Sequence, residues 1–455
     1  MSVSLSSDKT VREAYGADAS GLRLVPELVA RPDSIEEVSE LLRRATADRT
    51  PVTCAGAQTS TTAASITDKG VLLSLRSLDR IWEVDEKART LRVEPGALVG
   101  EIKKKAAAAG LLFAPDPTSE EESTIGGAIA CNASGARTFK YGATRRHVQG
   151  LKVVMANGEL MEVRRSNLEK NTVGYAFAHD PIDWFIGSEG TLGIIVEAEL
   201  ALLPLPARVV GLAVFFAMEE DALRFVVAAR EARSVAPRCI EYFDQKAVEI
   251  ARATPSGGIL PGGAGAMVYV EEEIADDMDA TLGRWGDVIE ATATDFEPLV
   301  FDGEARLREA RKIRHSVPST MNERGGRYRE TGGRKVSTDW AVPYRALAEA
   351  IRIARALAAE RGIEQAVMYG HAGNGHPHQN FIARDAKELA TIEEVVEETL
   401  RQVLALRGTV AAEHGIGKIK RRWLPLQMNR LQIAMMTAVK KELDPLGILA
   451  PGNIL

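Results

Sequence analysis

The chain has 455 residues and a formal net charge of −6, with 45% hydrophobic and 26% charged residues. Its length exceeds that of one ordinary core, so we expect two or three domains with the composition of a soluble protein. The acidic balance argues against a protein that binds nucleic acid, and three cysteines without a C-x-x-C motif exclude a disulfide framework and a thiolate zinc site.

The first half of the chain alternates helices, strands and tight loops. Ser34 opens a capping box before a helix that carries Val38, Leu41, Leu42 and Ala45 on one face. The other elements expected in this half are strands at 51–53, 71–75 and 91–93 and a helix at 101–109. This mixture is typical of an α+β fold.

The Pro-Leu-Pro segment at 204–206 is the expected domain boundary. A β-α-β-α rhythm follows it and indicates an α/β, ferredoxin-like domain, with strands at 209–216 and 267–271 and helices at 219–233 and 277–291. Strands at 365–369 and 379–382 should flank a Gly/His turn. Helices are expected at 386–406 and 431–443.

The N-terminal residues and the lengths of the apolar stretches bear on where in the cell the protein is expected. Residues 1–12 are polar, so we expect no secretory signal, and no apolar stretch reaches the roughly 18 residues needed for a transmembrane segment. A cytoplasmic protein is expected, and peripheral docking at a membrane is compatible with the sequence. The basic run at 418–422 is interpreted as a solvated face.

Two glycine-rich segments are too specific for ordinary turns. Residues 124–135 read TIGGAIACNASG, and residues 185–195, FIGSEGTLGII, form an otherwise apolar, strand-like run with one carboxylate. Adjacent glycines allow a ligand to approach the backbone closely, and exposed N–H groups favour phosphate oxygens. The chain contains neither a G-x-G-x-x-G motif after a strand nor a P-loop, so a nucleotide site here would be of another kind. Tight turns between strands are the alternative.

Four of the seven histidines fall in two short motifs, GHAGNGHPH at 370–378 and EHG at 413–415. Histidine and carboxylate ligands suit Zn²⁺ and similar ions, and a catalytic site keeps three protein ligands and one open position. His371, His378 and Glu413 could supply the three ligands. A loop of surface histidines is the alternative.

Together these segments resemble the FAD-binding oxidases of the vanillyl-alcohol-oxidase type, which carry a PCMH-type FAD domain. Within that group the chain is similar to the branch that holds D-lactate dehydrogenase, D-2-hydroxyglutarate dehydrogenase and glycolate oxidase. The resemblance implies a two-subdomain FAD-binding domain at 1–205, a substrate (cap) domain at 206–420, and a C-terminal helical segment at 421–455 that returns to the FAD domain.

The resemblance also implies non-covalent FAD and a set of cofactor-binding residues. These are Gly56, Thr59, Pro115, Asp116, Ser119, Gly126, Gly127, Asn132, Ser134, Gly135, Glu189, Gly190, Gly193, Ile195 and Asn453. The family's Arg-Gly-x-Gly-Thr loop is altered here, because Ala55 stands at the arginine position and Gln58 at one glycine position. That loop contains no histidine, so it offers no covalent histidyl link to the flavin.

The same resemblance implies roles for the residues of the histidine motifs. His371, His378 and Glu413 fall on the family's metal ligands, with Zn²⁺ favoured over Mn²⁺ or Fe²⁺, and His414 falls on its catalytic histidine. Asn374 replaces the usual Asp, and His376 replaces the usual Asn. Arg314, Lys335 and Asn380 are the expected substrate-binding residues, since a carboxylate needs a cation and arginine offers a two-pronged contact.

The function implied is the oxidation of a small D-2-hydroxy acid, of the lactate, glycolate or 2-hydroxyglutarate type, to the 2-oxo acid. A metal would assist proton removal and the flavin would take the hydride. The electron acceptor is not identified, and a homodimer is compatible with the sequence. The alternatives are an enzyme of the same fold that acts on a different alcohol, and a flavin-binding component of a larger oxidase complex.

Overall fold

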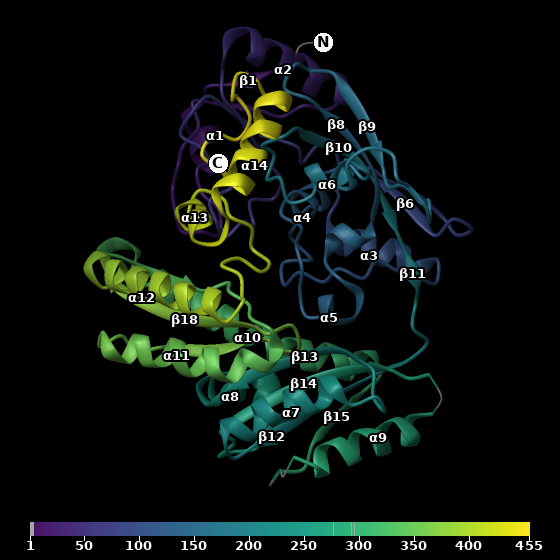
Figure 1. The fold of residues 1–455 in the computed structure, drawn as a ribbon, viewed down its shortest axis with the longest axis vertical. Helices are drawn as coiled ribbons and strands as arrows, with labels where there is room; N and C mark the ends of the chain where they lie inside the picture. The colour runs from purple at the N-terminus through teal and green to yellow at the C-terminus, as the bar shows by residue number, and fades with distance from the viewer. Residues whose placement is uncertain (1–3, 276, 293, 295) are drawn as a thin grey trace. The chain divides into compact units, whose positions relative to one another are not determined.

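The computed structural model describes residues 4–275, 277–292, 294 and 296–455 (Figure 1). The chain forms two compact units. Unit 1 comprises residues 1–134, 142–205 and 413–455, and unit 2 comprises residues 135–141 and 206–412. The chain therefore makes a short excursion into unit 2 at residues 135–141, within the segment predicted as the FAD domain. It passes to unit 2 again at Leu205–Pro206, inside the proline-containing segment, and returns at Ala412–Glu413, before position 420.

Unit 1 contains two main sheets. The first has the strand order β1 (Leu5–Ser6), β2 (Leu28–Ala30), β4 (Val71–Ser74), β3 (Val52–Ala55), and its last three strands are parallel. The second is antiparallel, with the order β5 (Ile81–Asp85), β6 (Thr90–Val93), β10 (Ile194–Ala201), β8 (Val148–Val154), β9 (Leu160–Arg164). Two short strands, β7 (Leu111–Leu112) and β11 (Leu203–Pro204), pair separately.

The helices of unit 1 follow from amphipathic patterns and caps. In α2 (Ile35–Asp48), the four predicted core residues are buried, and the hydroxyl of Ser34 accepts the Glu37 N–H at 3.2 Å. The other helices are α1 (Lys9–Ala14), α3 (Val99–Ala108), α4 (Ile125–Ala130), α6 (Ile182–Phe185), α13 (Leu424–Gln427) and α14 (Arg430–Leu443). The strand-like reading of 185–195 is wrong at its start, because α6 and a turn precede β10.

The C-terminal segment packs against the first sheet of unit 1. The N–H of Val52 donates to the Ile448 carbonyl at 2.8 Å, and the N–H of Ala450 donates to the Val52 carbonyl at 2.8 Å. Ile448 and Leu449 are buried in the same core as β3 and α2. Figure 1 shows this yellow end of the chain beside the purple N-terminal segments.

Unit 2 is built on one antiparallel sheet of seven strands. Its order is β15 (Leu299–Asp302), β12 (Val209–Phe216), β14 (Ala266–Glu273), β13 (Pro237–Asp244), β17 (Val367–His371), β18 (His376–Asp385), β16 (Gly332–Ser337). Its helices are α5 (Thr138–Tyr141), α7 (Glu219–Glu231), α8 (Gln245–Arg252), α9 (Met278–Glu290), α10 (Gly303–Gly326), α11 (Leu347–Glu360) and α12 (Ala386–Ala405).

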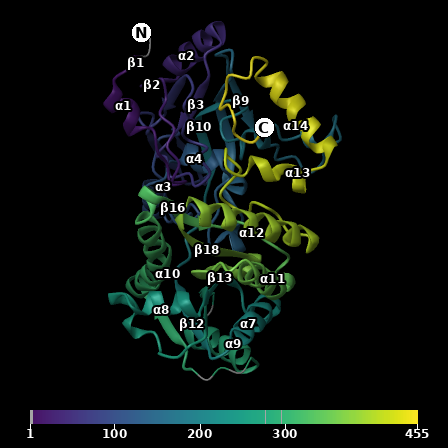
Figure 2. The ribbon, with the colours of Figure 1, turned by 90° about the vertical axis from the view of Figure 1, so that its left-hand side faces the viewer.

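Alternation along the strands divides these helices between the two faces of the sheet. Phe215 shares a core cluster with Ala247 of α8 and Ile313 of α10, whereas its neighbour Phe216 contacts Phe225 of α7. Consecutive side chains of a strand point to opposite faces, so α8 and α10 cover one face and α7 lies on the other. Figure 2 shows α11 and α12 side by side.

The mixture of helices and sheets confirms the predicted α+β fold class. None of the helices among the described residues combines the length and apolar content needed to cross a bilayer.

Candidate active site

Strand alternation brings the predicted site residues of unit 2 to one face of its sheet. His376, His378 and Asn380 lie two residues apart along β18, so their side chains share a face. The register pairs His371 of β17 with His376, which places His371 on the same face. Lys335 of β16 lies two residues before Ser337, the partner of Asn380, and therefore joins this face as well.

A buried carboxylate anchors the first of these histidines. Glu241 of β13 is 1% exposed and accepts hydrogen bonds from Nδ1 of His371 at 2.7 Å and from Nε of Arg314 at 2.6 Å. Burial alone would raise the pKa of Glu241, but Arg314 and His371 hold that pKa at about 2. Because a carboxylate only accepts, Nδ1 of His371 carries the proton, and Nε2 is the nitrogen that can ligate a metal ion.

The other two histidines each have a protein oxygen beside one ring nitrogen, and only His378 makes a hydrogen bond to it. Nδ1 of His378 lies 3.3 Å from the Thr338 carbonyl, which can only accept, so Nε2 is again the ligating nitrogen. Nε2 of His376 lies 3.2 Å from Oδ1 of Asp339 but outside hydrogen-bond geometry, and this buried nitrogen has no hydrogen-bond partner.

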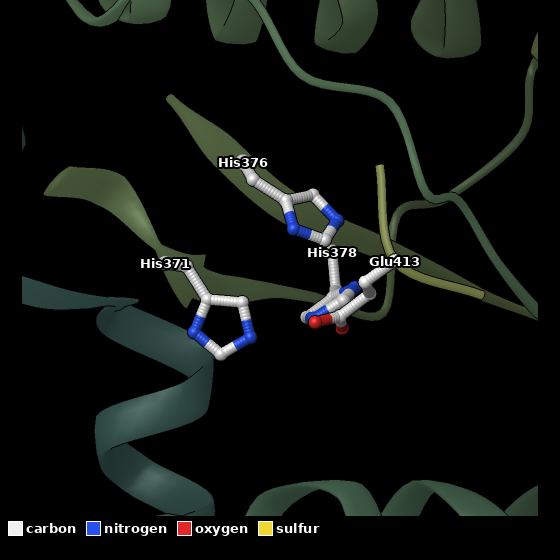
Figure 3. A group of neighbouring side chains, drawn as sticks. All are labelled: His371, His376, His378 and Glu413. Carbon is white, nitrogen blue, oxygen red and sulfur yellow. The ribbon is translucent and has the colours of Figure 1, made fainter. Parts of the chain in front are cut away.

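The three imidazoles, which we call the histidine cluster, are at most 7% exposed. One ring nitrogen from each lies within 4.8 Å of the others. Figure 3 shows the rings gathered together. Zn–N bonds are about 2.0–2.1 Å long, so a modest closing of this group would hold an ion. The donor set therefore fits a divalent metal.

The predicted substrate-binding residues of unit 2 surround the histidine cluster on the same face. Arg314 reaches the sheet from α10, where its Nη2 lies 3.4 Å from Nδ1 of His371. Lys335 donates to the side-chain oxygen of Asn322 at 2.8 Å, and burial lowers the pKa of Lys335 to about 8. Asn380 is fully buried, and its Oδ1 has no hydrogen-bond partner.

Seven of the predicted cofactor residues lie on three segments of unit 1 that we call the glycine cradle, residues 56–62, 124–127 and 187–193. A Cβ at Gly56 would lie 2.1 Å from Oγ1 of Thr124, and one at Gly190 would lie 2.7 Å from Sγ of Cys54. A Cβ at Gly126 would meet Pro95 at 2.6 Å. Only glycine allows these close approaches, and such backbone can come close to a bound nucleotide.

The altered loop after β3 retains the backbone conformation that a glycine would favour. Gln58, at the expected glycine position, has a φ of 56°. Its side-chain amide donates to the Tyr15 carbonyl at 2.9 Å and to the Ser65 carbonyl at 3.3 Å. These bonds hold the loop that contains Gly56 and Thr59, so the side chain of Gln58 provides contacts that a glycine could not make.

The glycine cradle includes a buried carboxylate that holds the second histidine motif. Glu189 has a φ of 51° and is 5% exposed. Its two oxygens accept the N–H groups of Ile416 at 2.6 Å and Gly417 at 2.8 Å. Burial raises the pKa of Glu189, and these N–H groups oppose that rise. Glu189 therefore fixes the turn that follows His414.

The C-terminal segment ties the same loops together. Nδ2 of Asn453 donates to the Ala64 carbonyl at 2.9 Å and to the Glu189 carbonyl at 3.3 Å. Nζ of Lys418 donates to Oδ1 of Asn453 at 2.7 Å and to the Ala63 carbonyl at 3.2 Å. The interpretation of the basic run as a solvated face is therefore wrong for Lys418, and Lys420 is only 6% exposed.

The remaining predicted residues occupy the expected segments. Gly127 donates its N–H to the Thr124 hydroxyl at 3.4 Å in the first turn of α4, and Asn132 has a φ of 49° just after that helix. Pro115, Asp116 and Ser119 lie in the loop before α4, and Ile195 lies at the start of β10. Ser134 and Gly135 follow α4, and Gly135 belongs to unit 2 rather than to unit 1.

Glu413 (labelled in Figure 3) and His414 begin the part of the chain that returns to unit 1. Within that unit, Oε2 of Glu413 accepts the Ser134 hydroxyl at 3.4 Å, and Nε2 of His414 lies 3.4 Å from Oε1 of Glu413. The preceding residue, Ala412, belongs to unit 2, where its N–H donates to the Asp339 carbonyl at 2.8 Å. Glu413 is thus one peptide bond away from a residue held beside Asp339.

Two sequence comparisons identify the family. Residues 26–164 match the FAD binding domain, and residues 205–454 match the domain described as "FAD linked oxidases, C-terminal domain". The chain belongs to the FAD-linked oxidases. It is an FAD-linked oxidoreductase, and the glycine cradle, where added Cβ atoms would collide, fits the FAD that the family binds.

Individual relatives match over nearly the whole chain. The glycolate oxidase subunit GlcD of Bacillus subtilis (strain 168) is 30% identical, with 97% of this chain and 92% of the relative covered. The D-lactate dehydrogenase of Archaeoglobus fulgidus is 30% identical, with 97% and 96% covered. The D-2-hydroxyglutarate dehydrogenase of Xanthomonas citri pv. viticola is 31% identical, with 94% and 89% covered.

The fold also matches a solved structure. An alkyldihydroxyacetonephosphate synthase superposes with a TM-score of 0.74 at 18% identity, and the match covers 98% of this chain and 82% of that one. This likeness supports the mixed helix and sheet fold class predicted from the sequence.

Sequence reasoning missed the acidic partners of the histidine cluster, Glu241 and Asp339. Glu241 lies 130 residues from His371 in the chain, so only strand pairing reveals it. Its one local sign was a charged residue inside the apolar run of β13, which is unusual for a buried strand.

Proposed function

We propose that this protein oxidises a small D-2-hydroxy acid to the corresponding 2-oxo acid. The observation that carries the proposal is the histidine cluster, which shares one sheet face with Arg314 and Lys335. Three relatives are named for glycolate, D-lactate and D-2-hydroxyglutarate, and these names support the same substrate class.

In this proposal His371, His378 and Glu413 hold a divalent metal, with Zn²⁺ favoured. The ion, when bound, makes the substrate hydroxyl more acidic. Glu241 positions His371 and keeps the proton on Nδ1, and the Thr338 carbonyl does the same for His378. The protein thereby presents both rings to the ion through Nε2.

The substrate carboxylate is held by arginine and lysine. A guanidinium carries five N–H donors, so Arg314 can bind Glu241 through Nε and still present an edge to a carboxylate. Lys335 adds a second positive charge, and Asn380 is the proposed polar contact beside them.

His414 is the proposed general base. An imidazole nitrogen can accept the hydroxyl proton as the carbon–hydrogen bond breaks. Glu189 holds the turn behind His414 through two backbone N–H groups. FAD, when bound, supplies the acceptor for the hydride that leaves the 2-carbon. The products are the 2-oxo acid and a proton on His414.

The physiological electron acceptor is a separate partner in this proposal, and the protein acts in the cytoplasm or at a membrane surface. Homodimerisation is compatible with the mechanism, which needs no residue from a second copy.

The test is an anaerobic absorbance titration of the purified, FAD-loaded protein with D- and L-2-hydroxy acids. Bleaching of the flavin band by a D-acid but not by its L-enantiomer is expected, and chelator treatment should abolish it until Zn²⁺ is restored. A flavin band that no 2-hydroxy acid bleaches would overturn the proposed substrate class. Full bleaching after verified metal removal would overturn the metal-assisted step.

A further inference from the structure

His376 departs from the asparagine that the family resemblance leads one to expect at this position, and it lies within the histidine cluster. Its ring centroid lies 4.6 Å from that of His378 and 5.4 Å from that of His371. It is paired directly across from His371 in the β17–β18 ladder. Its imidazole therefore faces the same space as the two proposed ligands of unit 2.

The surroundings of His376 are those of a metal ligand rather than of a core histidine. The residue is 4% exposed, and its Nε2 is a buried nitrogen without a hydrogen-bond partner. A core histidine is normally satisfied by hydrogen bonds, because an unpaired buried polar group is costly. A metal ion would remove that cost.

Asp339 places a buried carboxylate beside the unpaired nitrogen of His376, although the two make no hydrogen bond. Its Oδ1 lies 3.2 Å from Nε2 of His376, and the Asp339 side chain is fully buried. The negative charge of this carboxylate favours a cation beside the ring. Each of the three rings thus has an oxygen beside one nitrogen: Glu241 for His371, Asp339 for His376 and Thr338 for His378.

We propose that His376 is a third imidazole ligand of the metal site, so that unit 2 alone supplies three nitrogen donors to the ion. The proposal rests on the metal-assisted function proposed above. Imidazole donors favour Zn²⁺ and other late first-row ions, whereas oxygen-rich sites suit Mn²⁺ better. The replacement of asparagine by His376 therefore makes this chain more selective for Zn²⁺ over Mn²⁺.

The experiment is a calorimetric titration of the metal-free, FAD-loaded protein with Zn²⁺ and, separately, with Mn²⁺. The variant is His376→Asn, and the matched control is His179→Asn, which removes a histidine from unit 1. Loss of one ligand should weaken Zn²⁺ binding about 10-fold to 100-fold or more, on the scale seen for perturbed metal sites. Mn²⁺ binding should change less, so the Zn²⁺/Mn²⁺ affinity ratio should fall.

A spectroscopic count of ligands makes the result independent of affinity. Electron spin echo spectra of the Cu²⁺-loaded protein should show three coupled imidazoles in the wild type and in His179→Asn, and two in His376→Asn. Thermal unfolding of the metal-free variants would verify that each is folded.

The outcomes separate this inference from the proposed function. Equal Zn²⁺ affinity and equal imidazole counts in wild type and His376→Asn would overturn the role of His376 and leave the proposed metal site intact. Failure of the folded wild-type protein to bind either ion would overturn the proposed metal site and the third ligand together.

Discussion

The histidine cluster of unit 2 stands on regular strands, whereas the glycine cradle of unit 1 consists of loops and the first turn of a helix. Strand register places His371, His376 and His378 on one face, and neighbouring oxygens orient their rings. In the cradle, side chains matter mainly by their absence, because added Cβ atoms would collide with Thr124 or Cys54. In the proposed function, the first region acts through side-chain donors and the second through backbone that glycine allows to pack closely.

This contrast predicts different ways of damaging the two regions. Removing a side chain should harm the histidine cluster and its partners while FAD stays bound. Adding a methyl group should harm the cradle while metal binding persists.

The largest effect is expected at His414. His414→Asn should keep FAD bound but slow flavin reduction by a D-2-hydroxy acid by about 10²-fold or more, the usual scale for a general base. Anaerobic stopped-flow absorbance measures this rate. An unchanged rate would remove His414 from the proton transfer.

Glu241→Gln tests whether the carboxylate positions His371. Metal affinity should fall about 10-fold to 100-fold, because the amide offers one acceptor oxygen where Nδ1 of His371 and Nε of Arg314 need two. Glu271→Gln is the matched control, since Glu271 is a buried carboxylate on the neighbouring strand that binds Arg137 at 3.2 Å. Both variants should lose stability, but only Glu241→Gln should lose metal affinity by calorimetry. Equal metal affinities would show that Glu241 is structural only.

Gly56→Ala tests the glycine cradle. The added Cβ would lie 2.1 Å from Oγ1 of Thr124, so the loop must shift, at a cost of about 1–3 kcal/mol. FAD affinity, measured by flavin fluorescence, should fall while Zn²⁺ affinity stays at the wild-type value. Gly286→Ala in α9 is the control, because its Cβ meets nothing within 4 Å. Wild-type FAD binding by Gly56→Ala would contradict the assignment of this loop.

The smallest effect concerns the pH dependence of substrate binding. Burial lowers the pKa of Lys335 to about 8, so its positive charge is lost as the pH rises through that value. KM for the substrate acid should therefore rise several-fold between about pH 7 and pH 9, since a one-unit change above the pKa removes most of the cation. In Lys335→Arg the side chain stays charged, and the rise should disappear. The same KM rise in both proteins would assign it to another group.

Local patterns predicted the helices and strands well where one periodicity was dominant. The capping box at Ser34 and the apolar stripe behind it predicted α2, and continuous apolar runs predicted β12 and β14. The secondary structure of the segment at 185–195 was harder to predict. Its hydrophobic residues belong partly to a short helix and partly to a strand, so they show no single period. The domain limits and the roles of the site residues remain predictions.

The sequence by itself determined the residue types at both regions: paired glycines where backbone must be exposed, and clustered histidines where nitrogen donors are needed. Only the tertiary structure decided which residues support them, because Glu241, Asp339 and Glu189 meet their partners through strand pairing or loop closure across long stretches of chain. Tertiary contacts also decided the surroundings of Lys418, which belongs to a basic run that looks solvated in sequence but which binds Asn453 and the Ala63 carbonyl in unit 1. Composition and spacing report local chemistry, whereas partner choice and burial depend on contacts between distant residues.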